Sequence, residues 1–324
     1  MLSGAATVDV STLATLLEEI ESRKFNHAYL PAFGTRLAAL VLNDSVAAGL
    51  EGTAGNHLVV VHDAEASRIP WETLCLNEKF PGLVGGMSRR YLAADLSVAK
   101  WLEQRRHDDW LDVLLVVDPT EDLSGAVKEG QRIEELFTAS QQVHLTVVKG
   151  KAATRARLRA EFASGNYDVL HYAGHAYFDP GQTARSGVVC SDGNLTGAEL
   201  VELGNLPSLV FFNACESARV RSEVKRESER VSRDIQERIE RNAGLAEAFM
   251  RGGVANYIGT YWPVSDAAAE KFAGEFYSRV LVGETISSAL GKARAEVEKI
   301  RSQDWADYIF YGSIDFTVKK VAQR

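Results

Sequence analysis

The sequence predicts an α/β fold built on a mainly parallel central sheet with helices on both faces. From about residue 108, short apolar runs alternate with segments of helical periodicity, which is the pattern of βαβ units. The apolar runs are nearly continuous and do not alternate with polar residues, as is typical of parallel strands buried on both faces. The first hundred residues are less regular and make up a distinct N-terminal part.

The N-terminal part contains four predicted elements. Leucines at helical spacing, with an acidic opposite face, predict a surface helix over residues 10–22. The apolar runs Leu37–Leu42 and His57–His62, separated by turns that contain Asp and Gly, predict two strands of a hairpin. Residues 69–74 predict a turn that enters a short helix, because Pro70 suits a first helical position.

The regular part follows in chain order, and each element rests on the period of its apolar residues. Continuous runs rich in Val, Ile, Leu and aromatic residues predict strands at Leu111–Val117, Val143–Val148, Tyr167–Ala173, Ser208–Asn213, Ala255–Gly259 and Tyr308–Tyr311. Apolar residues at intervals of three and four predict helices at Ser124–Ser140, Ala153–Phe162, Gly197–Leu203, Gly244–Arg251, Asp266–Val282 and Thr285–Ile300.

Composition argues against several classes of protein. The 324 residues include 36 Lys and Arg and 44 Asp and Glu, a net charge of −8. This negative charge disfavours binding to the phosphates of nucleic acids. No apolar run reaches the roughly 18 residues that span a bilayer, and the N-terminus lacks the basic start of a secretory signal. Three scattered cysteines do not form a disulfide framework. A cytoplasmic protein with reduced thiols is expected.

One segment, residues 218–242, departs from this composition. It holds eight basic and six acidic residues, with a thin stripe of Val and Ile at helical spacing. The segment predicts either a solvated helix with ion pairs between residues four apart or a regulatory insertion that covers a site or is cleaved.

Reactive side chains follow two of the predicted strands. His175 comes two residues after the strand that ends at Ala173, and Cys215 comes two residues after the strand that ends at Asn213. Functional groups gather beyond the carboxyl ends of parallel strands, and neighbouring strands lie about 4.8 Å apart. A histidine beside a thiol can accept its proton, and the thiolate can then attack a carbonyl. Backbone N–H groups of Gly174, Ala176 and Glu216 are candidate donors to the resulting oxyanion.

Structural interpretations of the same residues stay open. A cysteine at the end of an apolar strand is often an inert buried thiol, and Cys75 and Cys190 are interpreted in that way. His171 lies inside a predicted strand and is interpreted as a packed histidine. Together His171 and His175 lack a third ligand, so no metal site is predicted. No serine-hydrolase elbow, phosphate-binding loop or dinucleotide fingerprint is present in the sequence.

The stretches LHYAGHAYFD and VFFNACES resemble the histidine and cysteine motifs of the CHAT domain, a bacterial branch of the caspase-like clan CD cysteine peptidases, related to caspases and separase. The resemblance covers roughly residues 35–318. Further segments resemble the family's pattern: Ile69–Leu74, Val117–Pro119, Asp122–Ala126, Ala246–Phe249, Gly252–Val254, Gly259–Asp266, Ala289–Ala295 and Trp305–Gly312.

This resemblance implies a three-layer caspase-like fold, with a helical segment at 1–34, a peptidase domain at 35–318 and a tail at 319–324. Within the domain, 35–107 form an N-terminal subregion and 108–318 the catalytic core. The resemblance also implies His175 as general base and Cys215 as nucleophile, with no metal or cofactor. The family usually has Gly directly after the histidine, whereas this chain has Ala176, which would be strained if that backbone needed a positive φ.

Substrate binding follows from the same resemblance, since caspase-like enzymes bind a peptide as an added strand. Residues 260–264 are the expected edge, with Trp262 either as a pocket wall or as ordinary core packing. Asp179, Asp192, Glu216 and Asp266 are candidate carboxylates for a pocket that selects Arg or Lys at P1, the residue before the cleaved bond. Arginines of 218–242 would then be sites of self-cleavage.

The predicted function is a cysteine endopeptidase that cleaves a protein substrate, as a regulated effector in bacterial defence or cell death. It would be a zymogen activated by a protein partner or an upstream protease, with no direct nucleic acid or membrane partner. The alternative is a degenerate caspase-like module that recruits a partner, which Ala176 favours and the intact His175 and Cys215 oppose. A small-molecule thiol hydrolase or acyltransferase fits the two residues but not the full set of motifs.

Overall fold

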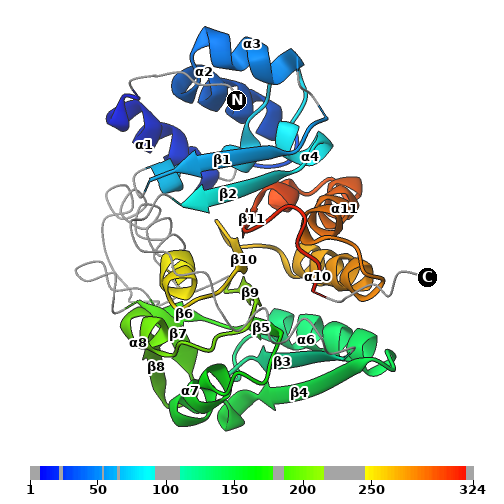
Figure 1. The fold of residues 1–324 in the computed structure, drawn as a ribbon. Coiled ribbons are helices and arrows are strands. Elements are labelled where there is room, and N and C mark those ends of the chain that lie inside the picture. The colour runs from blue at the N-terminus through cyan, green and yellow to red at the C-terminus, as the bar shows by residue number, and fades with distance from the viewer. Residues whose placement is uncertain are drawn as a thin grey trace.

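The computed structural model describes residues 8–21, 25–52, 55–63, 66–91, 110–177, 186–214 and 245–318. Its centre is an eight-stranded sheet in the order β1-β2-β11-β10-β9-β5-β3-β4, and a small sheet β6-β7-β8 lies beside it (Figure 1). The strands of the large sheet are β1 (Leu58–His62), β2 (Met87–Tyr91), β3 (Leu111–Val117), β4 (Val143–Lys149), β5 (Val169–Ala173), β9 (Leu209–Asn213), β10 (Asn256–Thr260) and β11 (Tyr308–Tyr311).

The large sheet consists of two parallel blocks that meet at one antiparallel pairing. Strands β4, β3, β5, β9 and β10 are paired in parallel. Strand β11 runs antiparallel to β10, and β2 and β1 follow β11 in parallel. The predicted α/β class with a mainly parallel sheet is therefore confirmed, and the carboxyl ends of the five core strands share one edge.

Helices cover both faces of the sheet. On one face, α6 (Ser124–Thr138) packs against α10 (Asp266–Leu281), which packs against α11 (Ile286–Lys299) (Figure 1). On the other face lie α7 (Arg155–Ala163), α8 (Gly197–Glu202) and the helical residues 245–251. The small sheet, which the sequence patterns did not indicate, comprises β6 (Ala176–Tyr177), β7 (Gly187–Cys190) and β8 (Gly193–Thr196).

The N-terminal prediction is partly wrong. The run Leu37–Leu42 forms the end and C-cap of α2 (Leu30–Val41) and is not a strand, because its apolar residues continue a helical stripe that begins at Leu30. The strand at His57–His62 exists as β1, but it pairs in parallel with β2 instead of forming a hairpin. The sequence patterns also missed α3 (Asp44–Gly52) and the short α4 (Pro81–Val84).

Other N-terminal expectations match the structure. The helix at 10–22 is present as α1 (Val10–Glu18) followed by η1 (Glu19–Glu21). The short helix expected within residues 69–74 is the 3-10 helix η3 (Trp71–Thr73), and a further 3-10 helix, η2 (Ala66–Arg68), precedes it. The domain boundary expected between residues 34 and 35, by contrast, falls inside helix α2, which is continuous there. No helix in the described ranges is long and apolar enough to span a membrane.

Candidate active site

The candidate site lies where β5 and β9 end side by side. Ala173 of β5 is in register with Asn213 of β9, and the Gly174 N–H continues the ladder by donating to the Asn213 carbonyl at 3.2 Å. His175 is the second residue after Ala173. Cys215, the second residue after Asn213 in the sequence, lies outside the described residues, as do Asp179, Glu216 and the segment 218–242.

His175 is held by its backbone and by its ring. Its carbonyl accepts hydrogen bonds from the Tyr172 hydroxyl at 2.7 Å and from the Val189 N–H at 3.2 Å. Its Nε2 lies 3.0 and 3.2 Å from the two carboxylate oxygens of Asp122. The imidazole is 18% exposed, so it can reach both solvent and a bound molecule.

Asp122 belongs to a tight loop between β3 and α6 that begins at Asp118. The backbone of Asp118 is left-handed, with φ of 42°, and its N–H donates to the Ala173 carbonyl at 2.8 Å. Its carboxylate accepts hydrogen bonds from the N–H groups of Asp122 and Leu123, both at 3.2 Å. Asp118 therefore fixes this loop to the end of β5 through its N–H and closes the loop through its carboxylate.

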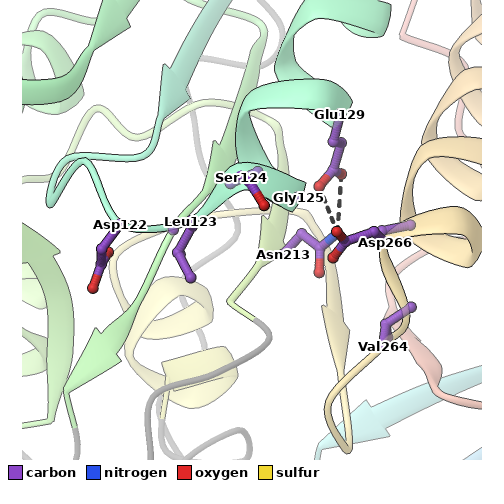
Figure 2. Close-up of a pocket in the computed structure, with 11 residues that line it drawn as sticks. Asp122, Leu123, Ser124, Gly125, Glu129, Asn213, Val264 and Asp266 are labelled. Carbon is purple, nitrogen blue, oxygen red and sulfur yellow. Dashed lines mark hydrogen bonds between the residues drawn. The ribbon is translucent and has the colours of Figure 1, made fainter. Parts of the chain in front are cut away.

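A pocket of about 280 Å³ opens at this edge of the sheet. The chain leaves β3 toward β4 and leaves β5 toward β9, so the connections diverge there, as at the ligand sites of other open α/β sheets. In Figure 2, Asp122 lies at one end of the pocket, while Glu129, Asn213 and Asp266 are grouped at the other. The lining residues are Asp122, Leu123, Ser124, Gly125, Ala126, Glu129, Gly174, Asn213, Val264, Asp266 and Ala269.

Beneath the pocket lies a buried polar network centred on Glu129, which is only 3% exposed. The Asn213 Nδ2 donates to both oxygens of Glu129 at 2.9 Å (Figure 2). The His171 Nε2 is 3.2 Å from the same carboxylate, although the angle is not that of a hydrogen bond. The His171 Nδ1 is 3.0 Å from the Tyr277 hydroxyl, whose pKa burial raises well above its usual value. His171 is thus a packed histidine, as expected.

A protein-family comparison gives the same assignment as the motifs: the CHAT domain model matches residues 31–313. This chain belongs to the CHAT-domain family. No curated protein sequence matches it.

Solved structures share the caspase-like fold of this CHAT domain. It is similar to RgpB of Porphyromonas gingivalis, in a complex of its pro- and mature domains, at 13% identity and a TM-score of 0.53, over 94% of this chain and 76% of that one. It also matches Saccharomyces cerevisiae separase, in a separase-securin complex, at 18% identity and a TM-score of 0.49. That match covers 79% of this chain, which spans only 16% of the separase chain.

Of the two expected pocket carboxylates that the structure describes, Asp192 and Asp266, one lies in the pocket of the CHAT domain. Asp266 lines it, at the first turn of α10. Asp192 lies elsewhere, because its carboxylate accepts the Arg155 N–H at 2.6 Å at the start of α7. In this structure Asp192 caps the start of α7 and is not among the residues that line the pocket.

Trp262 also differs from the pocket-wall interpretation. It is buried, its ring packs edge-on against Phe25 at 5.3 Å, and it is not among the pocket-lining residues. Core packing, the other interpretation of this tryptophan, therefore describes it.

Two backbone positions of the CHAT domain bear on the expected oxyanion donors. The N–H of Gly174 is donated to the Asn213 carbonyl, so Ala176 and Glu216 remain as predicted donors to the oxyanion. Ala176 starts β6 opposite Val188, and it is not among the non-glycine residues of positive φ in the described ranges. The replacement of the usual Gly by Ala therefore costs no backbone strain in this structure.

The sequence patterns missed Asp122 and Glu129 as site residues. Asp122 appeared only as part of a family motif, since nothing in the sequence links it to a histidine 53 residues later. Glu129 carried a usable signal, because it lies four and eight residues before the buried Ile133 and Phe137. A charged residue on the apolar stripe of a helix indicates a buried polar site. No group of three His, Cys, Asp or Glu side chains that could hold a metal occurs among the residues with described placement.

Proposed function

We propose that this CHAT domain is a cysteine endopeptidase in which Cys215 is the nucleophile and His175 the general base. The observation that carries the proposal is the register of β5 with β9, because His175 and Cys215 each follow a register partner by two residues. In the proposed reaction, the imidazole takes the thiol proton and the thiolate attacks the scissile carbonyl. The imidazolium then protonates the leaving amine, and water hydrolyses the thioester.

The substrate class of this proposal is a protein with a basic residue at P1. The carboxylates of Glu129 and Asp266 are grouped at the end of the pocket away from Asp122, which contacts His175, and no Lys or Arg is among the lining residues. A guanidinium or ammonium group that enters this pocket would gain charge-assisted hydrogen bonds, whereas an acidic side chain would meet like charges.

The biological part of the proposal rests on the family resemblance. The enzyme would be a cytoplasmic effector in bacterial defence or cell death, activated by a protein partner or by an upstream protease. The arginine-rich segment 218–242 follows the nucleophile in the sequence and would be an activation linker.

The decisive experiment uses fluorogenic peptides that differ only at P1, with Arg, Lys, Leu or Asp. Wild type, His175→Ala and Cys215→Ala are compared, and intact mass reports any cut within 218–242. We expect cleavage after Arg and Lys by wild type only. Glu129→Gln and Asp266→Asn should raise the KM of the Arg peptide and reduce the ratio of its kcat/KM to that of the Leu peptide.

Cys190→Ala is the matched control, since Cys190 is buried in β7 and is 3% exposed. Burial raises the pKa of its thiol to about 11, so its loss should leave cleavage unchanged. Equal cleavage by Cys215→Ala would refute the proposal. If no peptide is cleaved and a P1-Arg acyloxymethyl ketone fails to label Cys215, the interaction module becomes the better description.

A further inference from the structure

Asp122 makes a contact to the histidine that a dyad mechanism does not use. Both of its oxygens lie within hydrogen-bond distance of the His175 Nε2, at 3.0 and 3.2 Å. An ionised carboxylate is only an acceptor, so the ring atom that faces it must carry the proton. The other ring nitrogen of a neutral imidazole, Nδ1, then holds the lone pair.

The carboxylate of Asp122 is held in place independently of His175. The Thr120 hydroxyl donates a short hydrogen bond to its Oδ1, and Asp118 fixes the Asp122 backbone N–H. The Thr120 hydroxyl, with His175 as a further contributor, lowers the pKa of Asp122 below its usual value, although partial burial opposes this. Asp122 is therefore ionised at neutral pH, and the loop holds its carboxylate beside the His175 ring before any substrate binds.

We infer that Asp122 is a positioning residue for His175, and this inference rests on the proposed function. It keeps the proton on Nε2 and thereby leaves Nδ1 as the ring nitrogen that can accept the thiol proton. In the attack step, Nδ1 takes the proton from the Cys215 sulfur while the Nε2–H stays hydrogen-bonded to Asp122. Asp122 itself stays ionised, and its charge stabilises the imidazolium as it forms, as the aspartate does in Ser-His-Asp hydrolases.

A different role would use the same contact, with Asp122 holding the ring away from the thiol in a resting state. The two roles predict opposite effects. Removal of a positioning residue lowers kcat, whereas removal of a resting contact raises it.

The first test needs no peptidase activity. In the Cys215→Ala variant, proton and ¹⁵N NMR of labelled histidines is expected to show a His175 Nε2–H proton that exchanges slowly with water, assigned by its loss in His175→Gln. Adding Asp122→Ala should abolish that slow exchange. The matched control is Asp112→Ala, which removes the carboxylate 3.2 Å from the His144 Nδ1 at the start of β3. Equal spectra with and without Asp122 would overturn the inference.

The second test is kinetic and uses the otherwise wild-type chain. Asp122→Ala and Asp122→Asn are expected to lower kcat by roughly 10²-fold with little change in KM, a size typical of acid–base machinery, while Asp112→Ala leaves both unchanged. Asp122→Glu should restore part of kcat. A change confined to KM would reassign Asp122 to substrate binding, and a higher kcat would identify a resting contact; either result overturns the inference. If wild type cleaves no peptide and the P1-Arg acyloxymethyl ketone does not label Cys215, the proposed function fails, and the NMR still reports on the contact between Asp122 and His175.

Discussion

At the scale of single residues, the shape of the pocket depends on Gly125, which has no side chain. Gly125, in the first turn of α6, lies so close to Asp266 that a Cβ there would be 2.2 Å from the Asp266 Oδ1. The Gly125→Ala variant must therefore displace that carboxylate, which is the movable end of an exposed side chain. We expect the fold to persist and the KM for a P1-Arg peptide to rise about tenfold, equivalent to about 1.4 kcal/mol.

Gly291 supplies the control for this substitution. It lies inside α11, and nothing lies within 4 Å of a Cβ built there. The Gly291→Ala variant should leave KM unchanged and raise the free energy of unfolding by about 0.5–1 kcal/mol, since Ala suits a helix interior better than Gly. An unchanged KM in Gly125→Ala would show that Asp266 does not contact the P1 side chain.

What the sequence predicted of the site follows the range of each interaction. The position of His175 at the end of β5 was predictable, because strand ends are visible in the apolar pattern and share an edge in a parallel sheet. The place of Cys215 stays a prediction, because that residue lies outside the described residues. Asp122 was not predictable, because its contact to His175 depends on how one loop folds around Asp118. Trp262 was ambiguous, because an aromatic residue after a strand suits both a pocket wall and a core.

At the scale of elements, the η3 turn is joined to β2 by a buried ion pair. Glu72 and Arg89 are 1% and 0% exposed, and the Arg89 Nε donates to the Glu72 Oε1 at 3.0 Å. Breaking a buried pair leaves an uncompensated charge. We therefore expect Glu72→Gln to lower the free energy of unfolding by about 3–5 kcal/mol, measured by urea unfolding.

An exposed pair is the comparison for this variant. Arg132 and Glu135 on α6 are 48% and 70% exposed and lie 3.5 Å apart. Glu135→Gln should lower the free energy of unfolding by less than about 1 kcal/mol. If Glu72→Gln and Glu135→Gln lowered the free energy of unfolding by similar amounts, burial of the pair between Glu72 and Arg89 would not explain the loss.

The same pair explains why β2 was not predicted. Its sequence, MSRRY, carries two arginines and lacks the apolar run of a buried strand. Arg89 is nevertheless fully buried, because its charge is matched by a residue 17 positions earlier. A pattern within a single strand contains no sign of that partner. By contrast, Leu111–Val117 and Tyr308–Tyr311 match their predicted bounds, since their burial depends on their own apolar residues.

At the scale of the whole molecule, Asp307 joins the two parallel blocks of the sheet. It precedes β11 and accepts the N–H groups of Tyr261 and Trp262, which follow β10, at 2.6 and 2.5 Å. Burial raises the pKa of Asp307 well above its usual range, against the effect of these N–H groups. The folded protein therefore holds this proton more tightly than the unfolded chain does.

The stabilising contribution of Asp307 is complete below its unfolded pKa of about 3.9 and is lost as the pH rises toward its raised folded value. In Asp307→Asn the side chain does not titrate. We expect the free energy of unfolding of wild type to fall relative to that of Asp307→Asn as the pH rises from 4 to 8, measured by urea unfolding. A difference between the two proteins that stays constant across this range would contradict the assignment.

The pairing of β2 with β11 has a consequence for the order of synthesis. Residues 87–91 emerge from the ribosome long before residues 308–311, and β2 pairs with β11 on one side and with β1 on the other. Until β11 is made, the edge of β2 that faces it has no strand to pair with. The buried Arg89 lies on β2. Unpaired strand edges invite association between nascent chains. Association between nascent chains through β2 is therefore expected in the interval between the synthesis of these two strands.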